Sequence, residues 1–100
     1  MEILKWISNW FSNHCDEDWE YENQIKIETV SNPGWYITID LKDTLLENFV
    51  LKQELIEKEP NDWYFYDFEE SKFKASGDLT KLQFLLSEFK RVVEKTSANS

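Results

Sequence analysis

Five carboxylates lie within the eight residues from Cys15 to Glu22, and the aromatic side chains of Trp19 and Tyr21 stand among them. No Lys or Arg occurs between Lys5 and Lys26, so this stretch carries a dense negative charge. Acidic groups steer basic proteins toward a surface, and large rigid aromatic side chains anchor them there. The stretch therefore predicts a binding surface for a basic protein, made of Asp16, Glu17, Asp18, Trp19, Glu20, Tyr21 and Glu22.

The same carboxylates have part of the spacing of a calcium loop. Asp16, Asp18 and Glu20 match the first, third and fifth positions of such a loop. The sixth position needs Gly and the twelfth a bidentate Glu, whereas this chain has Tyr21 and Ile27 there. The sequence therefore predicts neither a metal site nor another cofactor.

The neighbouring His14 and Cys15 are residue types that could form a base and a thiol nucleophile. However, the residues that follow Cys15 are carboxylates, and their negative charge disfavours the reactive thiolate. The chain has one His and one Cys, no Gly-rich phosphate loop and no Gly-x-Ser-x-Gly elbow. We therefore expect that it is not an enzyme.

The acidic run also has a plainer interpretation, as a solvated loop after a helix. In that case Trp19 turns inward and packs under the helix instead of anchoring a partner. The residues alone leave both interpretations open. Trp35 and Trp63 have apolar neighbours on expected strands, and we predict that both pack in the core or on the sheet.

Length and composition indicate one domain that folds without disulfides. The chain has 100 residues, of which 41% are hydrophobic and 16% aromatic, and a single cysteine. We expect the domain to span residues 1–100, with a frayed tail at 96–100. The first residues do not have the pattern of an export signal, and no apolar run approaches the roughly 18 residues of a membrane span, so a cytoplasmic location is expected.

The net charge of -9 is unevenly distributed along the chain. Residues 1–70 hold 17 acids and 5 bases, whereas residues 71–100 hold 3 acids and 6 bases. An acidic surface repels nucleic-acid phosphates and anionic membranes, so neither is expected as a partner. A basic protein is the natural partner of such a chain.

Two segments have helical periodicity. Apolar side chains recur at spacings of three and four within residues 2–14, which predicts an amphipathic helix. A second helix is predicted after Asp78, which we expect to be its N-cap. Its apolar stripe consists of Leu79, Leu82, Leu85, Leu86, Phe89, Val92 and Val93.

The middle of the chain predicts strands. Residues 24–30 and 35–41 alternate between the two faces of a half-buried strand. Pro33 and Gly34 between them predict a type II turn with Gly34 at positive φ, and hence an antiparallel hairpin. Residues 49–57, 63–69 and 72–75 predict further strands.

The order of these elements predicts the fold class. No strand–helix–strand alternation occurs, so the expected class is α+β, with a four- to five-stranded antiparallel meander sheet. The N-terminal and C-terminal helices are expected to pack together on one face of the sheet.

Six short blocks spread over nearly the whole chain resemble a known family. They are Cys15-Asp16-Glu17-Asp18-Trp19-Glu20, Ile25-Lys26-Ile27-Glu28-Thr29, Asn32-Pro33-Gly34-Trp35, Ile39-Asp40-Leu41, Asn61-Asp62-Trp63 and Lys72-Phe73-Lys74. In this order they are similar to the signature blocks of bacterial immunity protein family fifty-three. The resemblance implies a small cytoplasmic antidote, encoded beside a polymorphic toxin, which protects the producing cell by binding the toxin domain. It implies no catalytic residues.

The chain departs from the family pattern in three places. The pattern has Gly at the position of Glu17, His near that of Tyr21, and a Gly-Gly-Pro-like turn in place of Ser76-Gly77-Asp78. These differences concern the choice of partner rather than the fold.

Our hypothesis from the sequence is therefore an immunity protein that covers a basic toxin surface, such as the active cleft of a nuclease, with its acidic segment. The carboxylates pair with Lys or Arg, and Trp19 or Tyr21 is the desolvated anchor. The alternative is a regulatory or scaffold module that binds a basic protein segment and has no link to a toxin.

Overall fold

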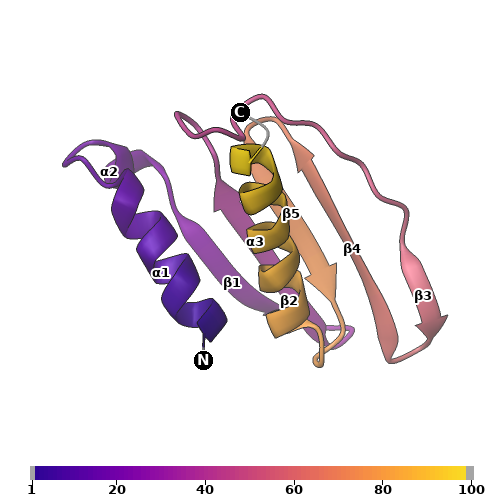
Figure 1. Cartoon of the computed structure of the whole chain (residues 1–100). Helices are drawn as coiled ribbons and strands as arrows, with labels where there is room; N and C mark the ends of the chain where they lie inside the picture. The colour runs from indigo at the N-terminus through magenta and orange to yellow at the C-terminus, as the bar shows by residue number, and fades with distance from the viewer. Residues whose placement is uncertain (1, 99–100) are drawn as a thin grey trace.

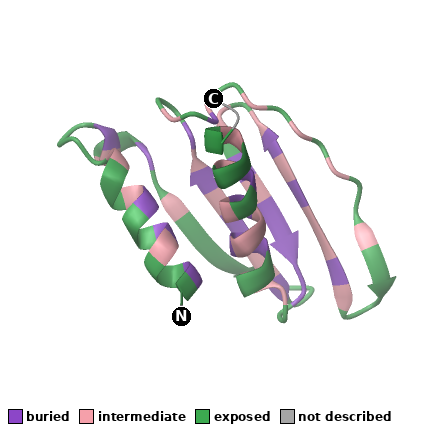
Figure 2. Ribbon diagram, in the orientation of Figure 1, coloured by how far each residue is buried: buried purple, intermediate pink, exposed green. Residues whose placement is uncertain are grey.

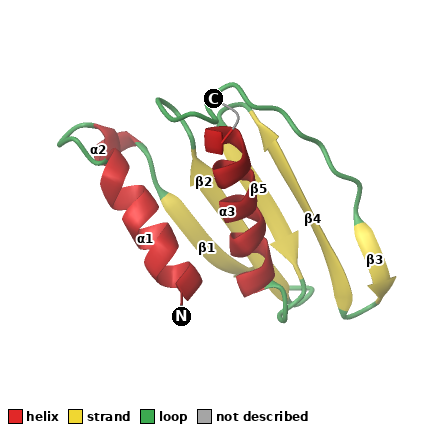
Figure 3. Ribbon diagram, in the orientation of Figure 1, coloured by secondary structure: helices red, strands yellow, loops and turns green. Residues whose placement is uncertain are grey.

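The computed structural model describes residues 2–98 and contains two layers, a five-stranded antiparallel sheet and a layer of helices on one of its faces (Figures 1 and 3). The expected α+β class, with one helix before the strands and one after them, is confirmed. The elements are α1 (Glu2–His14), α2 (Trp19–Glu22), β1 (Ile25–Val30), β2 (Gly34–Asp40), β3 (Ile56–Glu59), β4 (Asp62–Glu69), β5 (Lys72–Gly77) and α3 (Leu82–Ala98).

The strand order is β1-β2-β5-β4-β3, so the sheet is not the simple meander that we predicted. The chain leaves β2, crosses to the far edge to form β3, and returns through β4 to place β5 beside β2. Phe73 and Ala75 of β5 are fully buried, whereas β3 has the charged sequence Ile-Glu-Lys-Glu. An apolar strand buries most of its surface, and so stabilises the fold most, at the centre of a sheet. A short charged strand is suited to an edge.

The predicted hairpin of β1 and β2 is present, but its turn is not the predicted type II turn. The Asn32–Pro33 bond is cis, and Gly34 has no positive φ because it already belongs to β2. The reason for glycine here is close packing. A Cβ atom on Gly34 would lie 2.5 Å from the carbonyl oxygen of Gly77 and 3.0 Å from the indole ring of Trp63.

The strand predicted at residues 49–57 is mostly absent. Leu51 forms an isolated bridge with Phe68, with backbone N···O distances of 2.9 and 2.7 Å, and regular pairing begins only at Ile56. The other two predicted strands exist as β4 and β5, and β5 extends to Gly77. The irregular alternation in residues 49–57 is consistent with this result, because it offers no continuous apolar face.

The core lies between the sheet and the two long helices (Figure 2). Alternate side chains of the central strands point into it, and the apolar stripes of α1 and α3 close it. The ring of Phe89 on α3 is fully buried and contacts the rings of Trp10, Phe68 and Phe73 at centroid distances of 5.1, 6.2 and 5.1 Å. This aromatic cluster joins α1, α3 and the sheet.

The last helix differs from the prediction at both ends. It begins at Leu82, so Asp78 is not its N-cap, and it continues to Ala98. Residues 96–98 of the tail that we expected to be frayed are therefore helical, and residues 99 and 100 lie outside the described part. No helix within residues 2–98 is both long and apolar enough to cross a bilayer.

Candidate functional site

The acidic segment, residues 15–22, consists of a loop at residues 15–18 and the short helix α2. A carboxylate oxygen of Asp16 accepts hydrogen bonds from the backbone N–H groups of Asp18, at 3.0 Å, and Trp19, at 2.7 Å. The carboxylate of Glu20 accepts from the N–H groups of Asp16, at 3.0 Å, and Glu17, at 3.2 Å. The bonds from Trp19 and Asp18 lower the pKa of Asp16. These two carboxylates therefore hold the loop in shape.

Trp19 is buried beneath α1, with 7% of its surface exposed. Its ring lies 5.1 Å from that of Phe11 and 6.2 Å from that of Trp10, and its indole N–H donates a 2.6 Å hydrogen bond to the carbonyl oxygen of Lys42. Of the two interpretations of Trp19, inward packing is confirmed. An exposed anchor at this residue is wrong, because the ring is buried against Trp10 and Phe11.

Tyr21, in contrast, is 80% exposed. It lies at a hollow of about 320 Å³ whose wall also contains acidic side chains. We call this feature the acidic hollow; it is lined by Asp16, Asp18, Trp19, Tyr21, Glu22, Asn23 and Asp43. Within residues 2–98 none of its carboxylates forms an ion pair with Lys or Arg. Its negative charge is therefore available to a partner.

Two of the predicted residues, Glu17 and Glu20, are not among the lining residues of the hollow. Glu17 is exposed and does not line it, and Glu20 is half-buried and occupied by its bonds to the loop backbone. Asp43 is a member that the sequence analysis missed. It reaches the hollow because Trp19 is bonded to the preceding residue, Lys42. No local sequence pattern indicates a contact between these two loops.

Glu17 has φ 80°, in the left-handed region that favours glycine. The resemblance to the family leads us to expect Gly at this position. The left-handed conformation suits that Gly better than the Glu that this chain has.

His14 and Cys15 are not arranged as a catalytic pair. His14 Nδ1 donates to the carbonyl oxygen of Trp10 at 2.7 Å, and the thiol of Cys15 donates to that of Phe11 at 3.4 Å. Desolvation, followed by the charges of Glu20 and Asp16, raises the pKa of the thiol. Both side chains therefore bond to carbonyl oxygens in the last turns of α1. The raised pKa disfavours the thiolate of Cys15. No group of His, Cys, Asp and Glu in the described part of the chain is arranged to hold a metal ion.

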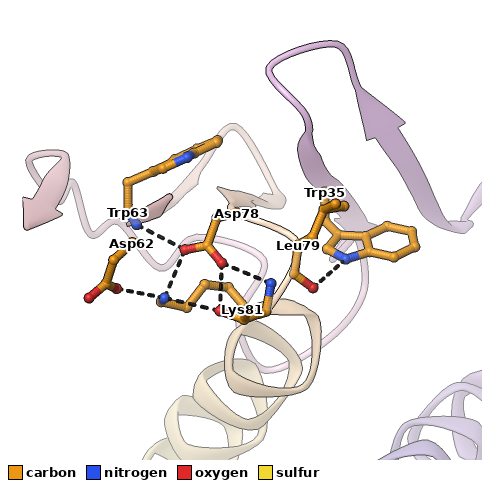
Figure 4. A network of polar contacts seen from close by, with 7 residues as sticks. Trp35, Asp62, Trp63, Asp78, Leu79 and Lys81 are labelled. Atoms are coloured by element: carbon orange, nitrogen blue, oxygen red, sulfur yellow. Dashed lines mark hydrogen bonds and ion pairs between the residues drawn. The ribbon is translucent and has the colours of Figure 1, made fainter. Parts of the chain in front are cut away.

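A second polar cluster joins the end of β5 to the start of α3 (Figure 4). Asp78 accepts hydrogen bonds from the backbone N–H groups of Trp63, at 2.9 Å, and Thr80, at 2.8 Å, and from the ammonium group of Lys81 at 2.8 Å. Lys81 also pairs with Asp62 at 2.7 Å. All of these charges are paired within the chain, so the cluster fixes the turn before α3 and offers little to a ligand.

Comparison with known proteins supports the resemblance seen in the sequence. The model of the family Immunity protein 53 matches residues 4–94. The chain belongs to this family. No curated protein and no solved structure matched the chain. Membership in the Immunity protein 53 family supports a general role in neutralising a toxin, implies a cognate toxin as partner, and favours an inhibitor over an enzyme.

Proposed function

We propose that this immunity protein neutralises its cognate toxin by placing the acidic hollow and the adjacent Glu17 against a basic surface of the toxin. The observation that supports this proposal is the combination of unpaired carboxylates and the exposed ring of Tyr21 in one hollow. A nuclease toxin fits this chemistry best, because its active cleft carries Lys or Arg for substrate phosphates. The proposed place of action is the cytoplasm of the producing cell.

The residues of the acidic segment have different tasks in this proposal. Glu17, Asp18, Glu22 and Asp43 attract the toxin and pair with its cations, and Tyr21 is the side chain that becomes desolvated. Asp16 and Glu20 hold the loop through its backbone N–H groups. Trp19 fixes the segment against α1 and the Lys42 carbonyl, so it acts by positioning the surface.

Charge reversal tests the proposal without disturbing the loop. The double variant Asp18→Lys with Glu22→Lys leaves the hydrogen bonds of Asp16 and Glu20 intact. We expect association with a catalytically inactive form of the cognate toxin domain to slow by at least about tenfold at low salt, and its salt dependence to flatten. Stopped-flow or surface-plasmon measurements at several ionic strengths give both quantities.

The matched control is Glu57→Lys with Glu59→Lys, which changes the net charge equally at the exposed edge strand β3. We expect this control to slow association far less than the variant in the hollow. Equal effects of the two variants would show that only net charge matters. Unchanged association in both would remove the acidic hollow from the interface. Binding without protection of toxin-expressing cells would favour the regulatory-module alternative.

A further inference from the structure

The two edges of the sheet differ in how well they are protected from pairing with another strand. The edge strand β3 has four residues, three of them charged, and a register shift between Glu57 and Glu59. Such features discourage the addition of a further strand. The other edge strand, β1, has six residues in unbroken register with β2, and Ile27 at its middle is 42% exposed. The β1 edge is thus the open one.

The outward backbone groups of β1 follow from its pairing with β2. Asp40 N–H donates to the Gln24 carbonyl oxygen at 3.1 Å, and these two residues lie opposite each other in the antiparallel ladder. Because bonded and non-bonded pairs alternate in such a ladder, the N–H and C=O groups of Ile25, Ile27 and Thr29 point away from β2. No segment of residues 2–98 pairs with them.

An apolar groove runs beside this edge, where α1 lies next to β1 (Figure 1). Its volume is about 360 Å³, and it is lined by Ile7, Ser8 and Phe11 of α1 and by Ile25 of β1. Side chains of an added strand would alternate between the two faces of the sheet, so every second one would enter this groove. The site therefore fits an extended segment with apolar residues at alternate positions.

Charge determines which extended segment fits. Asn23, which lines the acidic hollow, lies two residues before the first residue of β1. A strand paired with β1 therefore ends close to the hollow, where a basic side chain would be neutralised. A second copy of this chain has a net charge of -9 and would bring a second acidic segment instead. A strand from a basic partner is the better match.

We propose that the free edge of β1 captures an extended strand of the cognate toxin. The strand hydrogen-bonds to Ile25, Ile27 and Thr29, places alternate apolar side chains in the groove between α1 and β1, and extends a Lys or Arg into the acidic hollow. This inference rests on the proposed function, because it assigns to the toxin a second contact that adjoins the hollow.

Residue-resolved amide hydrogen exchange, measured by NMR on the full chain with and without the inactive toxin domain, tests the inference. We expect the amides of Ile25, Ile27 and Thr29 to exchange rapidly in the free chain and at least about tenfold more slowly in the complex. Those of Lys26 and Glu28 already bond to β2 and should change less. Binding without protection of the three outward amides would overturn this inference alone. Absence of any binding would overturn the proposed function as well.

The variant Ile27→Pro provides an independent readout. It removes an outward N–H, and its ring obstructs an incoming strand, but the bonds between β1 and β2 remain. We expect the toxin to dissociate about tenfold faster than from Ile27→Val, with the salt dependence of association unchanged. The double variant Asp18→Lys with Glu22→Lys should instead flatten the salt dependence of association and change the dissociation rate less. If Ile27→Pro does not fold, the exchange experiment on the parent decides. A free chain that is dimeric with these amides already protected would assign the edge to a second copy.

Discussion

Removal of the Asp78 carboxylate tests how the turn into α3 is held. The side chain of Asp78 is 4% exposed and that of its partner Lys81 is 16% exposed. In Asp78→Ala the N–H groups of Trp63 and Thr80 lose their acceptor, and the more exposed Asp62 is the one carboxylate that still pairs with Lys81 among the described residues. Breaking a buried ion pair costs about 3–5 kcal/mol. Because Lys81 retains one partner, we expect the lower end, about 3 kcal/mol.

Urea unfolding followed by far-ultraviolet circular dichroism measures this loss. In a domain of this size about 3 kcal/mol lowers Tm by roughly 12–24 °C. The matched control is Asp62→Ala, which removes the carboxylate with the 46% exposed side chain and should cost less than about 1 kcal/mol. If Asp78→Ala costs no more than Asp62→Ala, the assignment of Asp78 as the centre of the cluster is refuted.

The same network predicts how stability depends on pH. Burial alone would raise the pKa of Asp78, but hydrogen bonds from Lys81, Thr80 and Trp63 outweigh it and hold the pKa well below its usual range. The stabilisation by ionised Asp78 is therefore fully present above the unfolded pKa of about 3.9 and is lost as the pH falls below it toward the folded value. We expect the difference in unfolding free energy between the parent and Asp78→Asn to be constant from about pH 5 to 8 and to shrink below about pH 4. A difference that does not change between about pH 3 and 7 would contradict this.

Three further substitutions test the loop, the strand contact and the core. Glu17→Gly should stabilise the chain by about 1 kcal/mol, because φ is 80° there, and a lower Tm in this variant would argue against backbone strain. Gly34→Ala should cost about 1–3 kcal/mol in urea unfolding, since its Cβ would lie 2.5 Å from the Gly77 carbonyl oxygen. Phe89→Ala should cost about 3–5 kcal/mol and weaken the near-ultraviolet circular dichroism of the aromatic cluster. An unchanged aromatic signal would show that the cluster does not depend on this ring.

The parts of the fold that sequence predicted well are those set by local periodicity. The spacing of apolar residues located α1 within residues 2–14, and the alternation around Pro33 located the hairpin of β1 and β2. The place of β5 between β2 and β4 depends on pairing between distant segments, which periodicity does not contain. The role of Gly34 was missed for the same reason, because its nearest neighbours, Gly77 and Trp63, are far away in the sequence.

In the candidate site, too, local features could be predicted from the sequence and long-range contacts could not. Charge density located the acidic segment, but charge alone could not separate the carboxylates that hold the loop, such as Asp16, from those open to a partner. The orientation of Trp19 depends on its contact with the Lys42 carbonyl, and so does the arrival of Asp43 at the hollow. This hydrogen bond, like the ring contacts of Trp19 with Trp10 and Phe11, joins segments that no sequence motif relates.

We propose that this immunity protein binds its cognate toxin through an acidic surface. Titration calorimetry of the purified chain against a catalytically inactive toxin domain, at low and at moderate salt, tests it most directly. We predict nanomolar or tighter binding that weakens as salt rises, because screening reduces the attraction between the unpaired carboxylates and the toxin cations. Tight binding that salt leaves unchanged would contradict an acidic interface, and absence of binding would contradict the proposed function itself.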